Sequence, residues 1–430
     1  MPHWMMERNV QWVLAGCVLL GISSGVLGSF ALLRRRSLMG DALAHAALPG
    51  VCAAFLLTGT RSLGFFLVGA TVAGLLGAFC IQAVTRHSRI KEDTALGLVL
   101  SVFFGFGIVL MTIIQHSPKA NQAGLDKFIF GQAASLIEAD VRAMAVCAAL
   151  ICVAAGLLFK EFKLLCFDSG FARGIGYSTM WLDGLLLLLI VLAVVVGLQA
   201  VGVVLMAAML ITPAAAARLW TDRLDRMVWL AGAFGAAAGA LGTVLSAVEL
   251  RMPTGPLIVL SATAVFVVSL FLAPRRGLVA RALRLIQLRA RVAREHALRH
   301  LYELAEASGR WEERVPLQEL AAVWGEPVAV VRRQLTRLEQ DGLTWHSGEH
   351  WGLSASGLQS AYEVVRNHRL WEMFLMHEGQ LGADHVDRDA DLIEHLLPPV
   401  IVRELERLLR VHGREPELPP SVHPLAGTGG

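Results

Sequence analysis

Long apolar stretches separated by short charged breaks dominate the chain from Val10 to Ala273. A membrane-spanning helix needs about 20 mostly apolar residues. Stretches of roughly that length occupy residues 10–33, 39–58, 63–85, 94–115, 140–159, 181–199, 201–220, 228–249 and 256–273. Residues 185–219 read as one continuous stretch, so the sixth and seventh could instead be a single long or re-entrant element. The pattern predicts eight to ten crossings, with nine as the working number.

Positive charge is unequally divided between the two sets of loops that nine spans would create. One set holds Arg34, Arg35, Arg36, Arg86, Arg89, Lys91, Lys160, Lys163, Arg173, Arg218, Arg223, Arg226, Arg275 and Arg276. The other holds only Arg8, Arg61, Lys119, Lys127 and Arg251. Lys and Arg collect on the cytoplasmic side of membrane proteins. The bias predicts a multi-pass protein of the bacterial inner membrane, with its N-terminus outside and its C-terminal half in the cytoplasm.

From Pro274 onward the chain is rich in Arg, Glu and His and has the pattern of a soluble protein. A basic helical stretch over 278–294 would suit a membrane surface or phosphates. Two short helices around the turn at Gly325 predict a helix-turn-helix over 316–341. Two strand-like runs around Gly348 would form a wing. Further helices are expected over 356–377 and 389–411, and the Pro- and Gly-rich residues 413–430 predict a disordered tail.

Net charge and cysteine content restrict the partners and metal sites that the chain can have. The formal net charge of +3 is too small to imply a nucleic-acid partner by itself. All six cysteines lie in the apolar half, without any CxxC spacing, and small scattered cysteines of this kind usually pack as hydrophobic residues. The soluble half contains no cysteine, so a thiolate metal site is excluded there.

A carboxylate and an imidazole stand inside the second apolar stretch. Asp41 and His45 are four residues apart, so they share one helix face with their Cβ atoms about 5–6 Å apart. Ionisable residues at membrane depth are costly and normally face a bundle interior or a transport pathway. Together the two side chains offer the oxygen and nitrogen ligands that Mn²⁺, Fe²⁺ or Zn²⁺ accept. A polar pair that merely fixes the helix end near the cytoplasm is the alternative.

Four segments resemble the ABC-type manganese, zinc and iron import permeases. They are residues 34–50 with the motif DALAHAALPG, residues 89–97, residues 124–133 and residues 201–214. The resemblance covers about residues 10–273 and implies a homodimeric or pseudo-dimeric permease with the general fold of the large vitamin B12-type importers. It also implies that Asp41 and His45 are the metal-coordinating pair in the channel.

The same resemblance extends to the loop over residues 167–176, which is similar to the helix that couples such permeases to their ATPase subunit. It places Asp168, Ala172 and Gly176 at the coupling contact. No GxxxxGK[ST] phosphate loop occurs in the chain, so ATP hydrolysis is expected from a separate subunit and the chain itself is not an enzyme. The further partners implied are an extracytoplasmic metal-binding protein and a second permease copy or a sister permease.

The soluble half carries a second group of metal-type side chains. His368 and Glu372 form another i, i+4 pair, and Asp391, Glu394 and His395 share one face of the last expected helix. An ordinary charged surface is the alternative. Residues 291–410 resemble the iron- and manganese-dependent repressors, and the resemblance implies six metal ligands: His296, His368, Glu372, Asp391, Glu394 and His395. A set of oxygen and nitrogen ligands without sulfur favours Mn²⁺ or Fe²⁺.

The second helix of the helix-turn-helix is the candidate DNA-reading element. Arg332, Arg333 and Arg337 could meet phosphates or guanine edges. Its first residues, 327–331, are Pro, Val, Ala, Val and Val, and such an apolar edge suits docking to a protein as well as entry into a major groove.

The sequence therefore predicts an all-α membrane domain of about nine helices, followed by a cytoplasmic winged helix-turn-helix and a helical metal-binding and dimerisation domain. The expected boundaries are 1–275, 276–361 and 362–412, with the tail at 413–430. The leading hypothesis is a permease subunit of a divalent-metal importer, for manganese before iron or zinc, whose soluble part responds to the same metals. The alternative is a membrane-anchored, metal-dependent transcription regulator.

Overall fold

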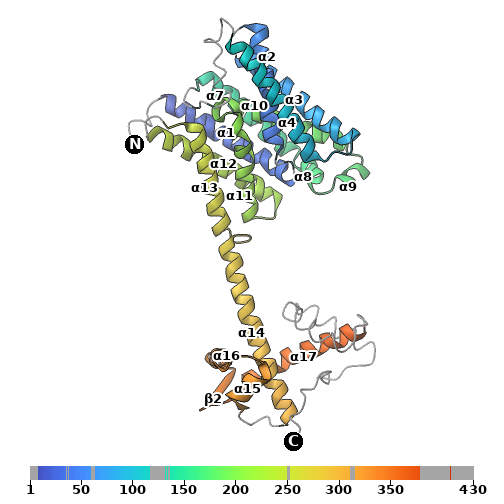
Figure 1. Ribbon diagram of the computed structural model, residues 1–430, viewed down its shortest axis with the longest axis vertical. Helices are drawn as coiled ribbons and strands as arrows, with labels where there is room; N and C mark the ends of the chain where they lie inside the picture. Colours follow the sequence, from blue (N-terminus) through green and yellow to red (C-terminus); the bar gives the residue numbers. More distant parts are fainter. Residues whose placement is uncertain are drawn as a thin grey trace. The chain divides into compact units, whose positions relative to one another are not determined.

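The computed structural model describes residues 8–34, 36, 38–59, 63–116, 131, 133, 136–248, 252–309, 315–377 and 407. The chain forms two compact units, Met1–Arg281 and Ala282–Gly430 (Figure 1). The first unit is helical throughout its described part, and the second combines helices with a small sheet. The expected helix over 389–411 and the tail over 413–430 lie outside the described residues, apart from Arg407.

Each of the nine expected apolar stretches is a helix. They are α1 (Arg8–Leu33), α2 (Met39–Thr58), α3 (Leu63–His87), α4 (Glu92–Gln115), α7 (Glu138–Leu157), α10 (Thr179–Val201), α11 (Val203–Trp220), α12 (Leu224–Val248) and α13 (Thr254–Leu272). Eight of these described helices are long and apolar enough to cross a membrane, whereas α11 has the shorter apolar stretch Leu205–Trp220. The polytopic helical fold is thereby confirmed.

The break between α10 and α11 decides between one long element and two helices. Gly202 separates them with φ 88° and ψ 166°, a backbone conformation that is essentially restricted to glycine. Its N–H still donates to the carbonyl of Leu198, at 2.9 Å, and so closes the last turn of α10. The sixth and seventh stretches are therefore two separate helices joined at one residue.

Close backbone contact between α1 and α12 forms the centre of the first unit. A Cβ atom added at Gly21 would stand 2.1 Å from the carbonyl oxygen of Gly235, and one at Gly25 would stand 2.2 Å from that of Ala231. Small residues at such crossings let helices in lipid pack without a hydrophobic driving force. α2 packs in the same unit against α3, α4 and α11 (Figure 1).

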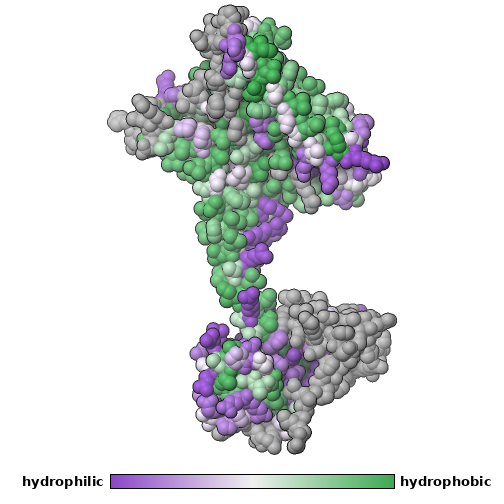
Figure 2. Space-filling model, viewed as in Figure 1, coloured by the Kyte–Doolittle hydropathy of each residue, from purple (hydrophilic) through white to green (hydrophobic). Residues whose placement is uncertain are grey.

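Large apolar side chains cover the outer surface of these helices (Figure 2). Leu57, Phe79, Leu157 and Trp229 are each more than 60% exposed. A soluble protein would bury side chains of this size, whereas a helix facing hydrocarbon exposes them to lipid tails. The surface is thus that of a membrane domain.

The second unit is a winged helix. Its described elements are most of α14 (Leu278–Ser308), β1 (Val315–Pro316), α15 (Leu317–Trp324), α16 (Val328–Gln340), β2 (Thr344–Ser347), β3 (His350–Leu353) and α17 (Ala355–His377). The strands form an antiparallel sheet in the order β1-β3-β2. Gly325 and Gly348 have φ near 65°, where glycine costs least, and they make the turn before α16 and the turn of the wing.

The core of this unit explains why its helices face one another. Leu301 of α14, Leu320 of α15, Leu335 of α16 and Val365 of α17 are all buried in one cluster. The basic helix expected to end at residue 294 continues to Ser308, because its second half carries the apolar residues that α15, α16 and α17 cover. The helix-turn-helix and the wing are confirmed.

Candidate functional site

Asp41 and His45 lie on one face of the first turns of α2. The Nε2 atom of His45 stands 3.4 Å from the Oδ1 atom of Asp41. The His45 ring meets Phe104 of α4 edge to face, with centroids 4.8 Å apart. Within the described part of the chain, the buried Nδ1 atom of His45 has no hydrogen-bond partner. Asp41 keeps a third of its side chain accessible, so the pair can be reached from outside the core.

The pair has the spacing that a shared cation requires. Two ligands bound at about 2.1 Å to a tetrahedral metal ion lie about 3.4 Å apart. Asp41 also stands in the first turn of α2, where the helix dipole favours a carboxylate over a neutral side chain. No group of three or more His, Cys, Asp or Glu gathers anywhere in the described residues, so these residues supply only two ligands to an ion here.

A partly buried ion-pair cluster that the sequence reasoning missed holds the start of α2. Both Arg34 and Arg36 donate to Oδ1 of Asp183 on α10, each at 2.9 Å. Arg36 also pairs with Glu92 of α4 at 2.8 Å. Arg34 donates to the carbonyl of Leu165 in α8 (Phe159–Phe167) at 3.0 Å. Only the position of Asp183 near the start of an apolar stretch could have signalled this role.

The predicted coupling loop, residues 167–176, begins at the last residue of α8 and contains the short α9 (Ser169–Gly174). The Asp168 carboxylate accepts the backbone N–H of Phe171 at 2.8 Å and so caps α9. Ala172 is fully buried, and Gly176 ends the loop with φ 95°. The exposed side is apolar: Phe167, Phe171 and Ile175 are each more than half exposed. Sequence reasoning named the residues that shape the loop and missed those that it presents outward.

In the soluble unit the structure brings two of the six predicted metal ligands together. His368 Nε2 and Glu372 Oε1 of α17 stand 3.3 Å apart, and both side chains are almost fully buried. His296 lies on α14, where its ring meets that of His300 with centroids 6.3 Å apart. Asp391, Glu394 and His395 lie outside the described residues.

A fixed cation already contacts His368. The Nη1 atom of Arg299 lies 3.0 Å from Nδ1 and 3.2 Å from Nε2 of His368. Because the two distances are nearly equal, the guanidinium lies against the imidazole ring of His368. It is next to both ring nitrogens, the atoms that could bind a metal. A guanidinium is always protonated, and a divalent cation beside it would be strongly repelled. The described donors therefore do not fit a metal ion in the arrangement shown.

The three arginines predicted to contact DNA, Arg332, Arg333 and Arg337, do not share the same surroundings. Arg332 donates to both carboxylate oxygens of Glu349 in the wing, at 2.8 and 3.1 Å. Arg333 lies with Arg337 along a shallow groove on α16. A phosphate would therefore have to compete with Glu349 for Arg332.

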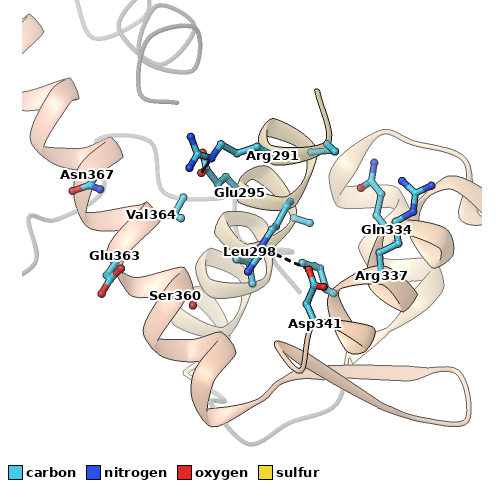
Figure 3. A pocket seen from close by; sticks show the side chains of 15 residues that line it. Arg291, Glu295, Leu298, Gln334, Arg337, Asp341, Ser360, Glu363, Val364 and Asn367 are labelled. Atoms are coloured by element: carbon cyan, nitrogen blue, oxygen red, sulfur yellow. Dashed lines mark ion pairs between the residues drawn. The ribbon is translucent and has the colours of Figure 1, made fainter. Parts of the chain in front are cut away.

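Arg337 also lines a cavity of about 650 Å³ between α14, α16 and α17. Figure 3 shows side chains from all three helices around it. In its wall, Arg294 of α14 pairs with Asp341 at 3.2 Å and Arg291 pairs with Glu295 at 3.6 Å.

Comparison with known proteins places the first unit in a family. The family model described as the ABC 3 transport family matches residues 6–273. The chain belongs to the ABC 3 transport family. A second model, described as the metal binding and dimerisation domain of the iron dependent repressor, matches residues 354–421. The two resemblances expected from the sequence are both confirmed.

Relatives of this ABC 3 transport family member carry metal-transport names. The manganese transport system membrane protein MntC of Bacillus subtilis is 48% identical over 415 residues, covering 96% of this chain and 94% of that protein. The zinc transport system membrane protein TroC of Treponema pallidum is 47% identical over 273 residues, covering 64% of this chain and 92% of that protein. The similarity to MntC thus spans both units, and that to TroC about two thirds of the chain.

A solved structure has the same fold as the transport unit. PsaBC from Streptococcus pneumoniae, solved in complex with a Fab, matches with a TM-score of 0.58 and 35% sequence identity. The match covers 66% of this chain and 96% of that chain.

Proposed function

We propose that the protein is the permease subunit of an ABC-type importer that moves a divalent transition metal across the bacterial inner membrane. The Asp41–His45 pair carries the proposal: it is a carboxylate and an imidazole 3.4 Å apart on a packed membrane helix. One hard oxygen and one imidazole nitrogen bind Mn²⁺, Fe²⁺ or Zn²⁺. Manganese is favoured because a relative that is 48% identical and spans both units is a manganese transport protein.

The metal would pass the pair as cargo. The carboxylate of Asp41 attracts the cation and replaces part of its water shell, and an imidazole nitrogen of His45 supplies a second ligand. A site with only two protein ligands holds an ion loosely, because water retains the other positions. Loose binding suits a pathway, since an ion that enters must also leave.

The energy would come from a separate ATPase subunit docked on the coupling loop. Phe167, Phe171 and Ile175 form the apolar contact surface, and Asp168 and Ala172 fix its shape. A two-fold arrangement with a second copy or a sister permease would enclose the pathway. An extracytoplasmic binding protein would deliver the metal. The Lys- and Arg-rich loops support a cytoplasmic position for the soluble unit.

The soluble unit would regulate this transport in response to internal metal. Its metal-binding and dimerisation match supports a metal-responsive role. The alternative is a regulator that binds DNA, for which phosphates would have to displace Glu349 from Arg332. Control of transport is the proposed role, because the metal-binding match lies on the same chain as a permease.

Metal uptake into proteoliposomes tests the transport proposal. The chain is reconstituted with its ATPase subunit and binding protein, and ⁵⁴Mn²⁺ uptake is compared between wild type, Asp41→Ala and His45→Ala. Both variants are expected to fall to the uptake of vesicles without ATP, because each removes one of two ligands. Glu138→Ala is the matched control, since Glu138 and Arg142 form an exposed i, i+4 pair on α7. Wild-type uptake by both pore variants would refute the pathway.

A further inference from the structure

Three ionisable side chains meet in the interior of the soluble unit. Arg299 of α14 and His368 and Glu372 of α17 are 6%, 3% and 2% exposed. The guanidinium lies against both nitrogens of the His368 ring, and the carboxylate of Glu372 stands 3.3 Å from Nε2 of the same ring. Burying an isolated carboxylate is very costly, so a positive charge close to this group stabilises the ionised form of Glu372.

Arg299 brings a positive charge to His368, the residue that contacts Glu372, without any metal. Its guanidinium is charged at every physiological pH, and it stands about as close to the imidazole nitrogens as a hydrogen-bond donor does. A divalent ion on either nitrogen of His368 would stand beside this fixed positive charge in a poorly solvated interior, where like charges repel strongly. The guanidinium and the metal therefore exclude each other.

Glu303 offers the guanidinium a place to move. Its Oε1 atom lies 3.6 Å from Nε of Arg299, one helical turn along α14. The side chain of Glu303 is 19% exposed, against 7% for Arg299. A rotation of Arg299 toward Glu303 would keep its charge paired and would release the ring nitrogens of His368.

We propose that Arg299 is a built-in cation that holds His368 and Glu372 in a metal-free arrangement and must leave them before a divalent metal binds. The inference rests on the metal-responsive role proposed above for the soluble unit. It deepens that role by naming a residue that tunes the metal affinity. The apparent dissociation constant for the metal equals the intrinsic constant divided by the fraction of molecules in which Arg299 has moved away. Arg299 thereby sets the metal concentration at which the unit responds.

Mn²⁺ titration of the full chain in nanodiscs tests this proposal. All variants carry Asp41→Ala and His45→Ala, so that the pore pair contributes no binding. Arg299→Met removes the competing charge and keeps the side-chain length, and it is expected to bind Mn²⁺ about ten-fold tighter, as when the competent state is about 10% populated in wild type. Arg299→Lys keeps the charge and is expected to bind as wild type does. Arg294→Met is the matched control, since Arg294 also lies on α14 but pairs with Asp341.

Hydrogen–deuterium exchange supplies a readout that does not depend on affinity. Without metal, peptides containing Arg299 and His368 are expected to exchange faster in Arg299→Met than in wild type, and Mn²⁺ is expected to restore their protection. If methionine prevents folding, Arg299→Gln keeps hydrogen-bond donors without the charge and gives the same contrast. Equal Mn²⁺ affinity in wild type, Arg299→Met and Arg299→Gln would overturn the role of Arg299 alone. Absence of Mn²⁺ binding in every variant would overturn the metal-responsive role as well.

Discussion

Asp183 joins two arginines in the transport unit, and its loss should destabilise that unit. Its Oδ1 atom accepts from Arg34 and Arg36, both at 2.9 Å, and the three side chains are between 10% and 20% exposed. Asp183→Asn keeps the shape and removes the charge, so two arginines lose their common anion. Through Arg34 and Arg36 the same carboxylate fixes the residues that lead into α2, where Asp41 stands.

The expected cost follows from the burial of this cluster. Removing one partner of a buried ion pair costs about 3–5 kcal/mol, because it leaves uncompensated charge. Asparagine can still accept one hydrogen bond and Arg36 retains Glu92, so the lower end applies, roughly 3 kcal/mol. At about 2 °C per kcal/mol for a domain above 150 residues, the thermal midpoint should fall by about 6 °C.

Thermal unfolding of the purified chain in detergent measures this shift, with Glu138→Gln as the matched control. Glu138 pairs with Arg142, and the two side chains are 48% and 73% exposed. An exposed pair of this kind contributes about 0.3–0.5 kcal/mol, so its loss should move the midpoint by about 1 °C or less. If Asp183→Asn moved the midpoint no further than Glu138→Gln, the reasoning from burial would be wrong.

Two further predictions concern backbone geometry and docking. Gly202→Ala should destabilise the chain by about 1–3 kcal/mol, because a residue with a Cβ is strained at φ 88° and ψ 166°. Chemical denaturation measures this change. An unchanged denaturation midpoint would show that the break between α10 and α11 does not need glycine. Phe171→Ala should weaken binding of the ATPase subunit at least several-fold without changing the thermal midpoint, because its side chain is 58% exposed. Trp229→Ala, 82% exposed on α12, is the control, and equal ATPase binding by both variants would argue against docking at α9.

Sequence alone determined the features that depend on neighbours along the chain. The nine helices follow from the length of apolar stretches, and the winged helix follows from turn glycines and short periodic segments. Asp41 and His45 share a face because a helix repeats every 3.6 residues. The same rule joins His368 to Glu372. None of these requires knowledge of which helix packs against which.

Tertiary structure decided everything that joins distant parts of the chain. Asp183 meets Arg34 across 149 residues and Arg299 meets His368 across 69, and no local pattern marks either pair. The apolar run over 185–219 conceals the break at Gly202, because the composition of a stretch does not reveal the backbone dihedral angles of one residue in it. Local periodicity comes from the backbone, which the sequence reveals directly. The partner of a buried charge depends on how whole helices pack, and for Arg299 that packing put a guanidinium where the ligand pattern alone had suggested a metal ion.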